Sequence, residues 1–269
     1  MKISLRRDGG AWSNATDSRS VGLGLREFKN MNKSPSLHTY LSNFMFMVNK
    51  MAKTSNTQRP KARKSKIFDI PNYAQSEEFT SSAACAMMVL KYTNKNFKMK
   101  KEEEFNIWQE AVGGSIWHGS KYGLAYALAK RGAKLNILSN NQKDEGYERK
   151  LAVYEGINLD TLKSSYDEVK EKVKGLKIKE AHGVVTVNNI KKSINDGNLP
   201  IVLVNANLIN PYLEASPHWV VIKGYDEDTF YINDPYSDST IAMEPDTFKQ
   251  AIGYENEYHM LSVSARRSK

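Results

Sequence analysis

Four polar residues, Gln75, Ser81, His218 and Asp234, stand out as candidates for nucleophilic chemistry. Ser81 begins a segment apolar enough for a buried helix, and Gln75 lies six residues before it. His218 begins a segment typical of a strand, and Asp234 ends the next such segment. A hydroxyl at a helix N-terminus lies near unpaired N–H groups and the positive end of the helix dipole. A histidine on a neighbouring strand could serve as its base, and a carboxylate could fix the tautomer of that histidine.

The spacing of these residues also fits a plainer interpretation. Serine at a helix start is commonly an N-cap, and a histidine in a hairpin is commonly structural. His218 and Asp234 are 16 residues apart across a predicted hairpin, so cross-strand pairing could bring them into contact. From the spacing alone, a catalytic and a structural interpretation both stay open.

The elements that would position these residues follow from hydrophobic periodicity and from glycines that end helices. The pattern predicts helices over residues 81–92, 105–112, 122–131, 162–173, 187–194 and 246–252. It predicts strands over residues 133–138, 201–204, 219–222, 230–232 and 260–263. The continuous apolar run 201–204 is typical of a strand buried on both faces. Helices come first and a mostly antiparallel sheet follows, which predicts an α+β domain.

Charge divides the chain into a basic arm and a folded body. Residues 1–66 contain 14 Lys+Arg against 3 Asp+Glu and show little periodicity, whereas the rest of the chain is nearly neutral. We expect a disordered arm over 1–66 and one domain over 67–269. Such an arm could make weak electrostatic contact with nucleic acid or an anionic surface. A translation start at Met45, Met47 or Met51 is an alternative that would remove much of it.

Composition excludes several classes of protein. The 269 residues, 40% of them hydrophobic, are enough for a substantial core. No apolar run is long enough for a membrane-spanning helix. The single cysteine cannot form an intramolecular disulfide, which fits a reducing compartment, and we expect a cytoplasmic protein. No histidine and carboxylate spacing fits a metal site and no glycine loop fits phosphate, so we expect no cofactor.

Three segments resemble papain-like peptidases of the bacteriocin-processing, double-glycine-leader type. They are QSEEFTSSAACAMMVLKY at 75–92, which resembles the active-site helix, IWQEAVGGSIWHGSKYGLAYALAKRG at 107–132, and PHWVVIKGYDEDTFYINDPY at 217–236, which matches the His and Asp motifs. The middle segment is similar to a stand-alone peptidase-like domain of the same superfamily. The likeness runs from about Ile70 to about Leu261 and implies a papain-like α+β fold, with a helical part packed on the sheet.

The resemblance also implies roles for the four polar residues. Gln75 takes the oxyanion-hole place, His218 the general-base place, and Asp234 the place that orients the histidine. The nucleophile place falls on Ser81, where the family has cysteine, and Ser82 stands where the family has glycine. A natural variant and an engineered loss of the nucleophile both stay open as the origin of Ser81.

We expect a structural role for the single cysteine and weaker candidate roles for the other histidines. Cys85 lies one helical turn after Ser81, where related proteins also have a second cysteine, and we expect it to be buried packing. His118 lies in a loop that could line the cleft. His182 and His259 are expected at the surface or at a strand edge.

These observations favour a peptidase-family protein with a Ser81, His218 and Asp234 version of the papain-like site, which acts on peptide or amide bonds if it is active. The alternative is a catalytically inactive pseudopeptidase that keeps the cleft and holds a peptide or protein ligand. A third hypothesis gives the function to the basic arm.

Overall fold

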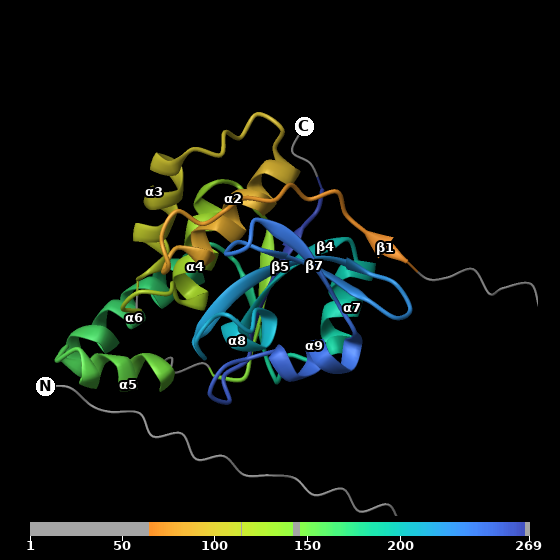
Figure 1. Cartoon of the computed structure of the whole chain (residues 1–269). Coiled ribbons are helices and arrows are strands. Elements are labelled where there is room, and N and C mark those ends of the chain that lie inside the picture. The colour runs from red at the N-terminus through yellow and green to blue at the C-terminus, as the bar shows by residue number, and fades with distance from the viewer. Residues whose placement is uncertain (1–64, 114, 142–145, 267–269) are drawn as a thin grey trace, which may run out of the picture. The chain divides into compact units, whose positions relative to one another are not determined.

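The structure is a computed structural model that describes residues 65–113, 115–141 and 146–266 (Figure 1). Most of the predicted basic arm, with the alternative start methionines, lies outside these residues. The end of the arm is described, and there Lys66 is part of strand β1 (Lys66–Ile67), which pairs antiparallel with β5 (Pro217–Tyr225). The domain therefore includes the last residue that the sequence assigned to the arm.

A mixed sheet forms the centre of the domain. Its strand order is β3-β2-β8-β4-β5-β6-β7, with β1 paired to β5, and every pair is antiparallel except β2 with β3. The remaining strands are β2 (Leu135–Ser139), β3 (Lys179–His182), β4 (Asn198–Asn205), β6 (Phe230–Asp234), β7 (Ser239–Met243) and β8 (His259–Ser264). This arrangement confirms the predicted α+β class and the mostly antiparallel sheet.

Strand β4 is buried on both faces, as its apolar run predicts. Ile201 and Leu203 belong to one hydrophobic core, and Val202 and Val204 belong to the other. Side chains alternate between the faces of a strand, so one strand contributes to both cores. The sheet therefore separates two layers of helices.

The helices divide between the two faces of the sheet (Figure 1). The first core contains buried side chains of α2 (Ser81–Thr93), α3 (Lys101–Ala111), α4 (Lys121–Lys130) and α6 (Leu159–Gly175). The second contains those of α7 (Val187–Asn195), α8 (Ala206–Ile209) and α9 (Pro245–Ala251). Helix α5 (Gly146–Tyr154) precedes α6. None of the helices in the described part of the chain is long and apolar enough to cross a membrane.

The predicted helices and strands are present, but five short elements were missed. They are β1, α5, β3, α8 and β7, none longer than nine residues. The burial of β7 alternates only between half-buried and exposed, and β3 is a mostly exposed edge strand. Neither has the apolar run that a sequence pattern detects.

Gly123 lets α4 lie directly against α3, because an added Cβ would lie 2.1 Å from the Ala111 carbonyl oxygen. Gly175, the last residue of α6, has nothing within 4 Å of such a Cβ. We expect Gly123→Ala to lower the free energy of unfolding by about 1–3 kcal/mol. Gly175→Ala should leave it unchanged or raise it by up to about 1 kcal/mol. Urea unfolding measures both, and equal stabilities would contradict the close contact.

Candidate active site

Helix α2 brings Ser81 into the interior of the domain. Residues 81–90 are all buried, and Ser81 is only 1% exposed. The N-cap Thr80 makes no side-chain bond to the helix, because its hydroxyl exchanges hydrogen bonds with the backbone of Glu77. These hydrogen bonds join the two ends of the turn before α2, from Glu77 to Thr80. No side chain therefore caps the first N–H groups of the helix.

The hairpin of β5 and β6 joins His218 to Asp234. Ile222 pairs with Ile232, and the two polar residues lie at the far ends of the strands. His218 Nε2 and Asp234 Oδ1 are 2.7 Å apart, and both side chains are buried. The structure thus brings together the pair that the sequence predicts to be in contact.

Asp234 is ionised beside this imidazole. Burial raises the pKa of Asp234, but the hydrogen bond and charge of His218, with the backbone N–H of Tyr236, outweigh burial and hold the pKa below its usual value. A carboxylate only accepts hydrogen bonds, so His218 Nε2 carries the proton. Nδ1 is then the ring nitrogen that can act as a base.

Ser81 contacts the strand through the residue after His218. The backbone N–H of Trp219 donates to Ser81 Oγ at 3.4 Å, which is a long hydrogen bond. Among the described residues, no hydrogen bond joins Ser81 to the imidazole of His218. The start of α2 therefore meets the start of β5 through the backbone of the residue that follows His218.

Gln75 lies near the site with its amide nitrogen turned away. Its backbone N–H donates to Pro235, directly after Asp234. Its Nε2 donates to the carbonyl oxygens of Glu77 and Glu78 at 2.9 and 3.0 Å, while Oε1 is buried without a partner among the described residues. An oxyanion needs N–H donors. In this conformation both donors of Gln75 are used within its own loop.

Cys85 is buried packing, as the sequence predicts. Its thiol is fully buried and donates to the Trp219 carbonyl oxygen at 3.2 Å. Burial raises the pKa of the Cys85 thiol well above its usual value, and the charge of Asp234 raises it further. A thiol in this state is neither a nucleophile nor a metal ligand.

The loop of His118 packs against the first turn of α2. Gly119 has a φ of +73°, and an added Cβ would lie 2.3 Å from Ser82 Oγ. The Trp219 indole N–H donates to the Gly119 carbonyl oxygen at 3.0 Å. Burial and the charge of His218 lower the pKa of His118 to about 4, so its imidazole is neutral at physiological pH.

The prediction for the other two histidines is half wrong. His182 is exposed on the edge strand β3, as expected. His259 is fully buried, with Nδ1 3.0 Å from Ser139 Oγ and Nε2 3.2 Å from a carboxylate oxygen of Glu257. The reason is topological: β8 lies between β2 and β4 inside the sheet.

Two residues that organise the site were not identified from the sequence. Trp219 contacts Ser81, Cys85 and the His118 loop, and it is part of the PHW motif. Glu104 is fully buried and bonds the segment that contains Gln75. Its spacing from the buried residues Ile107 and Ala111 was the available signal, since a glutamate on an apolar helix face needs partners.

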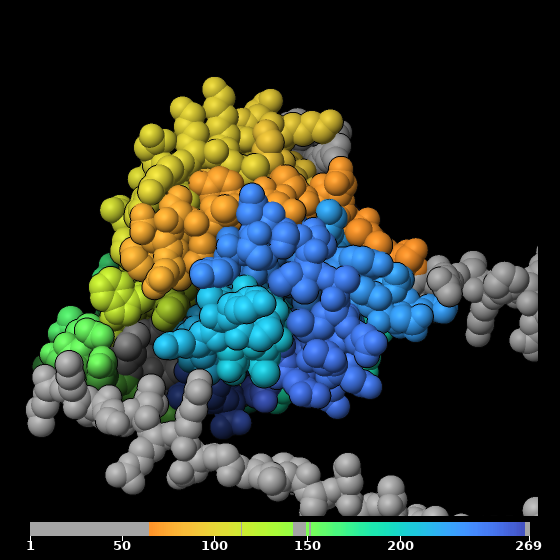
Figure 2. All heavy atoms as spheres, in the orientation of Figure 1, coloured from red at the N-terminus to blue at the C-terminus, as the bar shows by residue number. Residues whose placement is uncertain are grey.

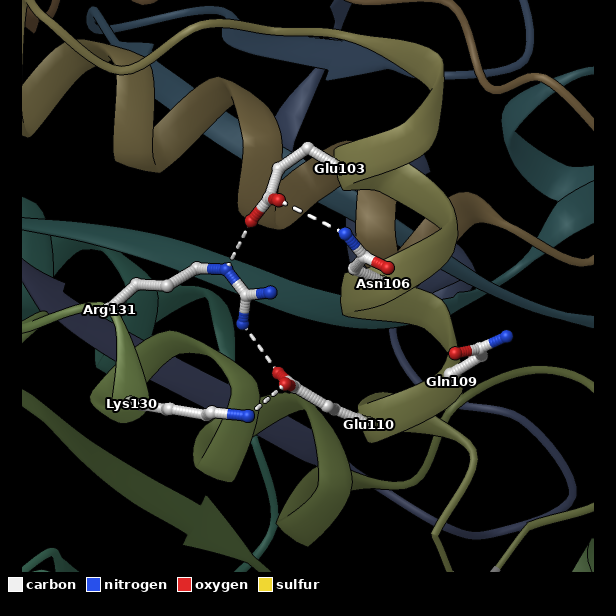
Figure 3. A pocket seen from close by; sticks show the side chains of 6 residues that line it. All are labelled: Glu103, Asn106, Gln109, Glu110, Lys130 and Arg131. Carbon is white, nitrogen blue, oxygen red and sulfur yellow. Dashed lines mark hydrogen bonds and ion pairs between the residues drawn. The ribbon is translucent and has the colours of Figure 1, made fainter.

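One surface hollow is separate from the site. It measures about 550 Å³ and is occupied by ion pairs between α3 and the end of α4, as Figure 3 shows. It is lined by Glu103, Asn106, Gln109, Glu110, Lys130 and Arg131. Among the described residues, no group of three His, Cys, Asp or Glu side chains could hold a metal ion.

Comparison with known proteins identifies relatives of this domain. The profile of a family described as Peptidase_C39 like matches residues 70–268. The crystal structure of a C39-like peptidase from Bacillus anthracis is also similar, with a TM-score of 0.47 and 15% identity, covering 77% of this chain and 100% of that chain. With the family match, the packing of α2 on the antiparallel sheet is the papain-like α+β fold that the sequence predicts.

The low pKa of His118 predicts loss of stability in weak acid. An unfolded chain binds a proton at His118 below about pH 6.5, whereas the folded chain does so only near pH 4. Stability should therefore fall as pH drops through this window, by about 1–2 kcal/mol between pH 7 and pH 5. Urea unfolding at both pH values measures it. His118→Gln should reduce the loss, while the exposed control His182→Gln should behave like the wild type.

Proposed function

The chain belongs to the Peptidase_C39-like family, and from this premise we propose that it binds peptides at Ser81 and acts on their amide bonds. The observation that carries the proposal is the buried hydrogen bond between His218 and Asp234, 2.7 Å long. An imidazole held by a carboxylate, with Nδ1 left as base, is what base-assisted attack requires. Its position beside the start of α2 supports Ser81 as the nucleophile.

In the proposed reaction Ser81 Oγ attacks the carbonyl carbon of the substrate, and His218 Nδ1 takes the hydroxyl proton. The backbone N–H of Ser81 and the amide of Gln75 stabilise the oxyanion that forms. The C–N bond then breaks, and His218 gives its proton to the leaving amine. Water hydrolyses the acyl-serine with the same base. The amide of Gln75 must first rotate away from the carbonyls of Glu77 and Glu78.

A hydroxyl at position 81 makes this reaction slower than a thiol would. A free thiol ionises near pH 8.5, and a helix N-terminus or an imidazolium lowers that value further. A serine hydroxyl is not ionised by such surroundings and depends on proton transfer during attack. The double-glycine-leader subtype remains part of the proposal and is supported by the motifs at 75–92 and 217–236.

A second candidate function is peptide binding without cleavage. It is favoured by the hydrogen bond that Ser81 Oγ accepts from Trp219 instead of one to His218. The engagement of both Gln75 donors within their own loop favours it too. In this alternative peptide binding is kept while the nucleophile is lost.

Replacing Ser81 by cysteine tests whether the site activates a nucleophile. In full-length Ser81→Cys, iodoacetamide should alkylate the introduced thiol at pH 6 at least about tenfold faster than a cysteine placed at the exposed Ser164. Adding His218→Ala should remove most of this advantage, because the imidazolium that stabilises the thiolate is gone. Mass spectrometry of tryptic peptides measures both rates, and unreactive Cys85 is the internal control. A rate equal to that of the exposed cysteine would refute the proposed site.

A fluorophosphonate probe separates the two candidate functions in the unmodified protein. The proposed reaction predicts slow labelling of Ser81 that is lost in Ser81→Ala and in His218→Ala, since a hydroxyl in a thiol-type site reacts slowly. Peptide binding without cleavage predicts no labelling of Ser81. In-gel fluorescence measures the result.

A further inference from the structure

Glu104 is a buried carboxylate that the proposed reaction does not use. It lies on α3, is fully buried, and forms no ion pair with any described residue. A buried carboxylate without hydrogen-bond donors would be strongly destabilising. The residues that supply its donors are therefore held firmly by it.

The donors to Glu104 lie on both sides of Gln75. The hydroxyl of Tyr73 donates at 3.0 Å, and Ser76 donates through its backbone N–H at 2.8 Å and its hydroxyl at 2.5 Å. All three partners are donors, which suits a group that only accepts. Burial and the charge of Glu104 also raise the pKa of Tyr73 to about 12, so this phenol keeps its proton.

The same segment is held from its other side by the strand that carries Asp234. The backbone N–H of Gln75 donates to the Pro235 carbonyl oxygen at 2.9 Å. Figure 2 shows the segment before α2, in orange, crossing the surface between α3, in yellow, and the C-terminal strands, in blue. The backbone of Gln75 is thus fixed between α3 and the end of β6.

We propose that Glu104 is a positioning residue that holds Gln75 at the oxyanion place, an inference that rests on the function proposed above. Gln75 reaches that place only by rotating its side chain, because its Nε2 now bonds the carbonyls of Glu77 and Glu78. Rotation of the Gln75 side chain brings its Nε2 to a fixed position beside the oxyanion only if the backbone of Gln75 does not move. Donors must lie within about 0.5 Å of the productive geometry to stabilise an oxyanion.

Two reagents in the full-length Ser81→Cys background separate this role from thiol activation. Iodoacetamide is attacked at its CH₂ carbon and loses iodide, so no oxyanion forms. With p-nitrophenyl acetate the thiolate adds to the carbonyl carbon and forms an oxyanion. The C–O bond then breaks, p-nitrophenolate leaves and a thioester remains. The ratio of the acylation rate to the alkylation rate therefore reports the oxyanion hole alone.

Glu104→Gln should lower this ratio about tenfold or more, with the alkylation rate changed less than twofold. Glu104→Asp, which keeps the carboxylate, should recover part of the loss. The matched control is Glu103→Gln on the same helix. Glu103 pairs with Arg131 at 2.7 Å on another side of α3 and should leave the ratio unchanged (Figure 3).

An unchanged ratio in Glu104→Gln would overturn the positioning role, and so would an equal fall in both rates, which marks general damage. If the Glu104 variants do not fold, Ser76→Ala removes one of the three donors and should lower the ratio to a smaller extent. Failure of Ser81→Cys itself to outpace the exposed cysteine with iodoacetamide would reject the proposed function. The assignment of Glu104 would then fall with it.

Discussion

Trp219 joins three segments of the candidate site, and the position of each depends on it. Its backbone N–H faces Ser81 Oγ, its carbonyl oxygen accepts from Cys85, and its indole N–H donates to Gly119. The indole is fully buried in the core that also contains α2. Because Trp219 contacts α2 twice and the His118 loop between α3 and α4 once, β5 cannot shift without moving Ser81 and the His118 loop. His218 is carried along as the preceding residue.

The electrostatics of this region permit one negative charge and oppose a second. Cys85 and Asp234 are both buried, yet the pKa of the thiol is raised while that of the carboxyl is lowered. The difference lies in the partner, since Asp234 has the imidazole of His218 whereas Cys85 faces a backbone carbonyl and the Asp234 charge. Cys85 therefore cannot replace the family's nucleophile, although it lies one helical turn from Ser81. Position 81, unlike Cys85, combines a helix N-terminus with a hydrogen bond to the residue that follows His218.

The sequence predicted those features whose causes are local. The apolar run at 201–204 and the hairpin between His218 and Asp234 follow from periodicity and a short turn, and both are present. The burial of His259 was missed because its partner Ser139 lies 120 residues away and on another strand. The orientation of the Gln75 amide could not be predicted from the sequence either, because it depends on hydrogen bonds to the carbonyl oxygens of Glu77 and Glu78 in a folded loop. The family motifs suggested which residues belong to the site, whereas the direction in which the Gln75 amide donates its hydrogen bonds is visible only in the structure.

The two contacts that form the candidate site, His218 with Asp234 and Ser81 with Trp219, join residues at very different separations along the chain. His218 and Asp234 are 16 residues apart and need only one hairpin, a structure that forms in roughly 1–10 μs on its own. The contact of Ser81 with Trp219 closes a loop of 138 residues, and such distant contacts slow folding because chain entropy must be lost first. The pair of His218 and Asp234 is therefore assembled by local contacts, while the contact of Ser81 with Trp219 forms only when the helical half docks on the sheet.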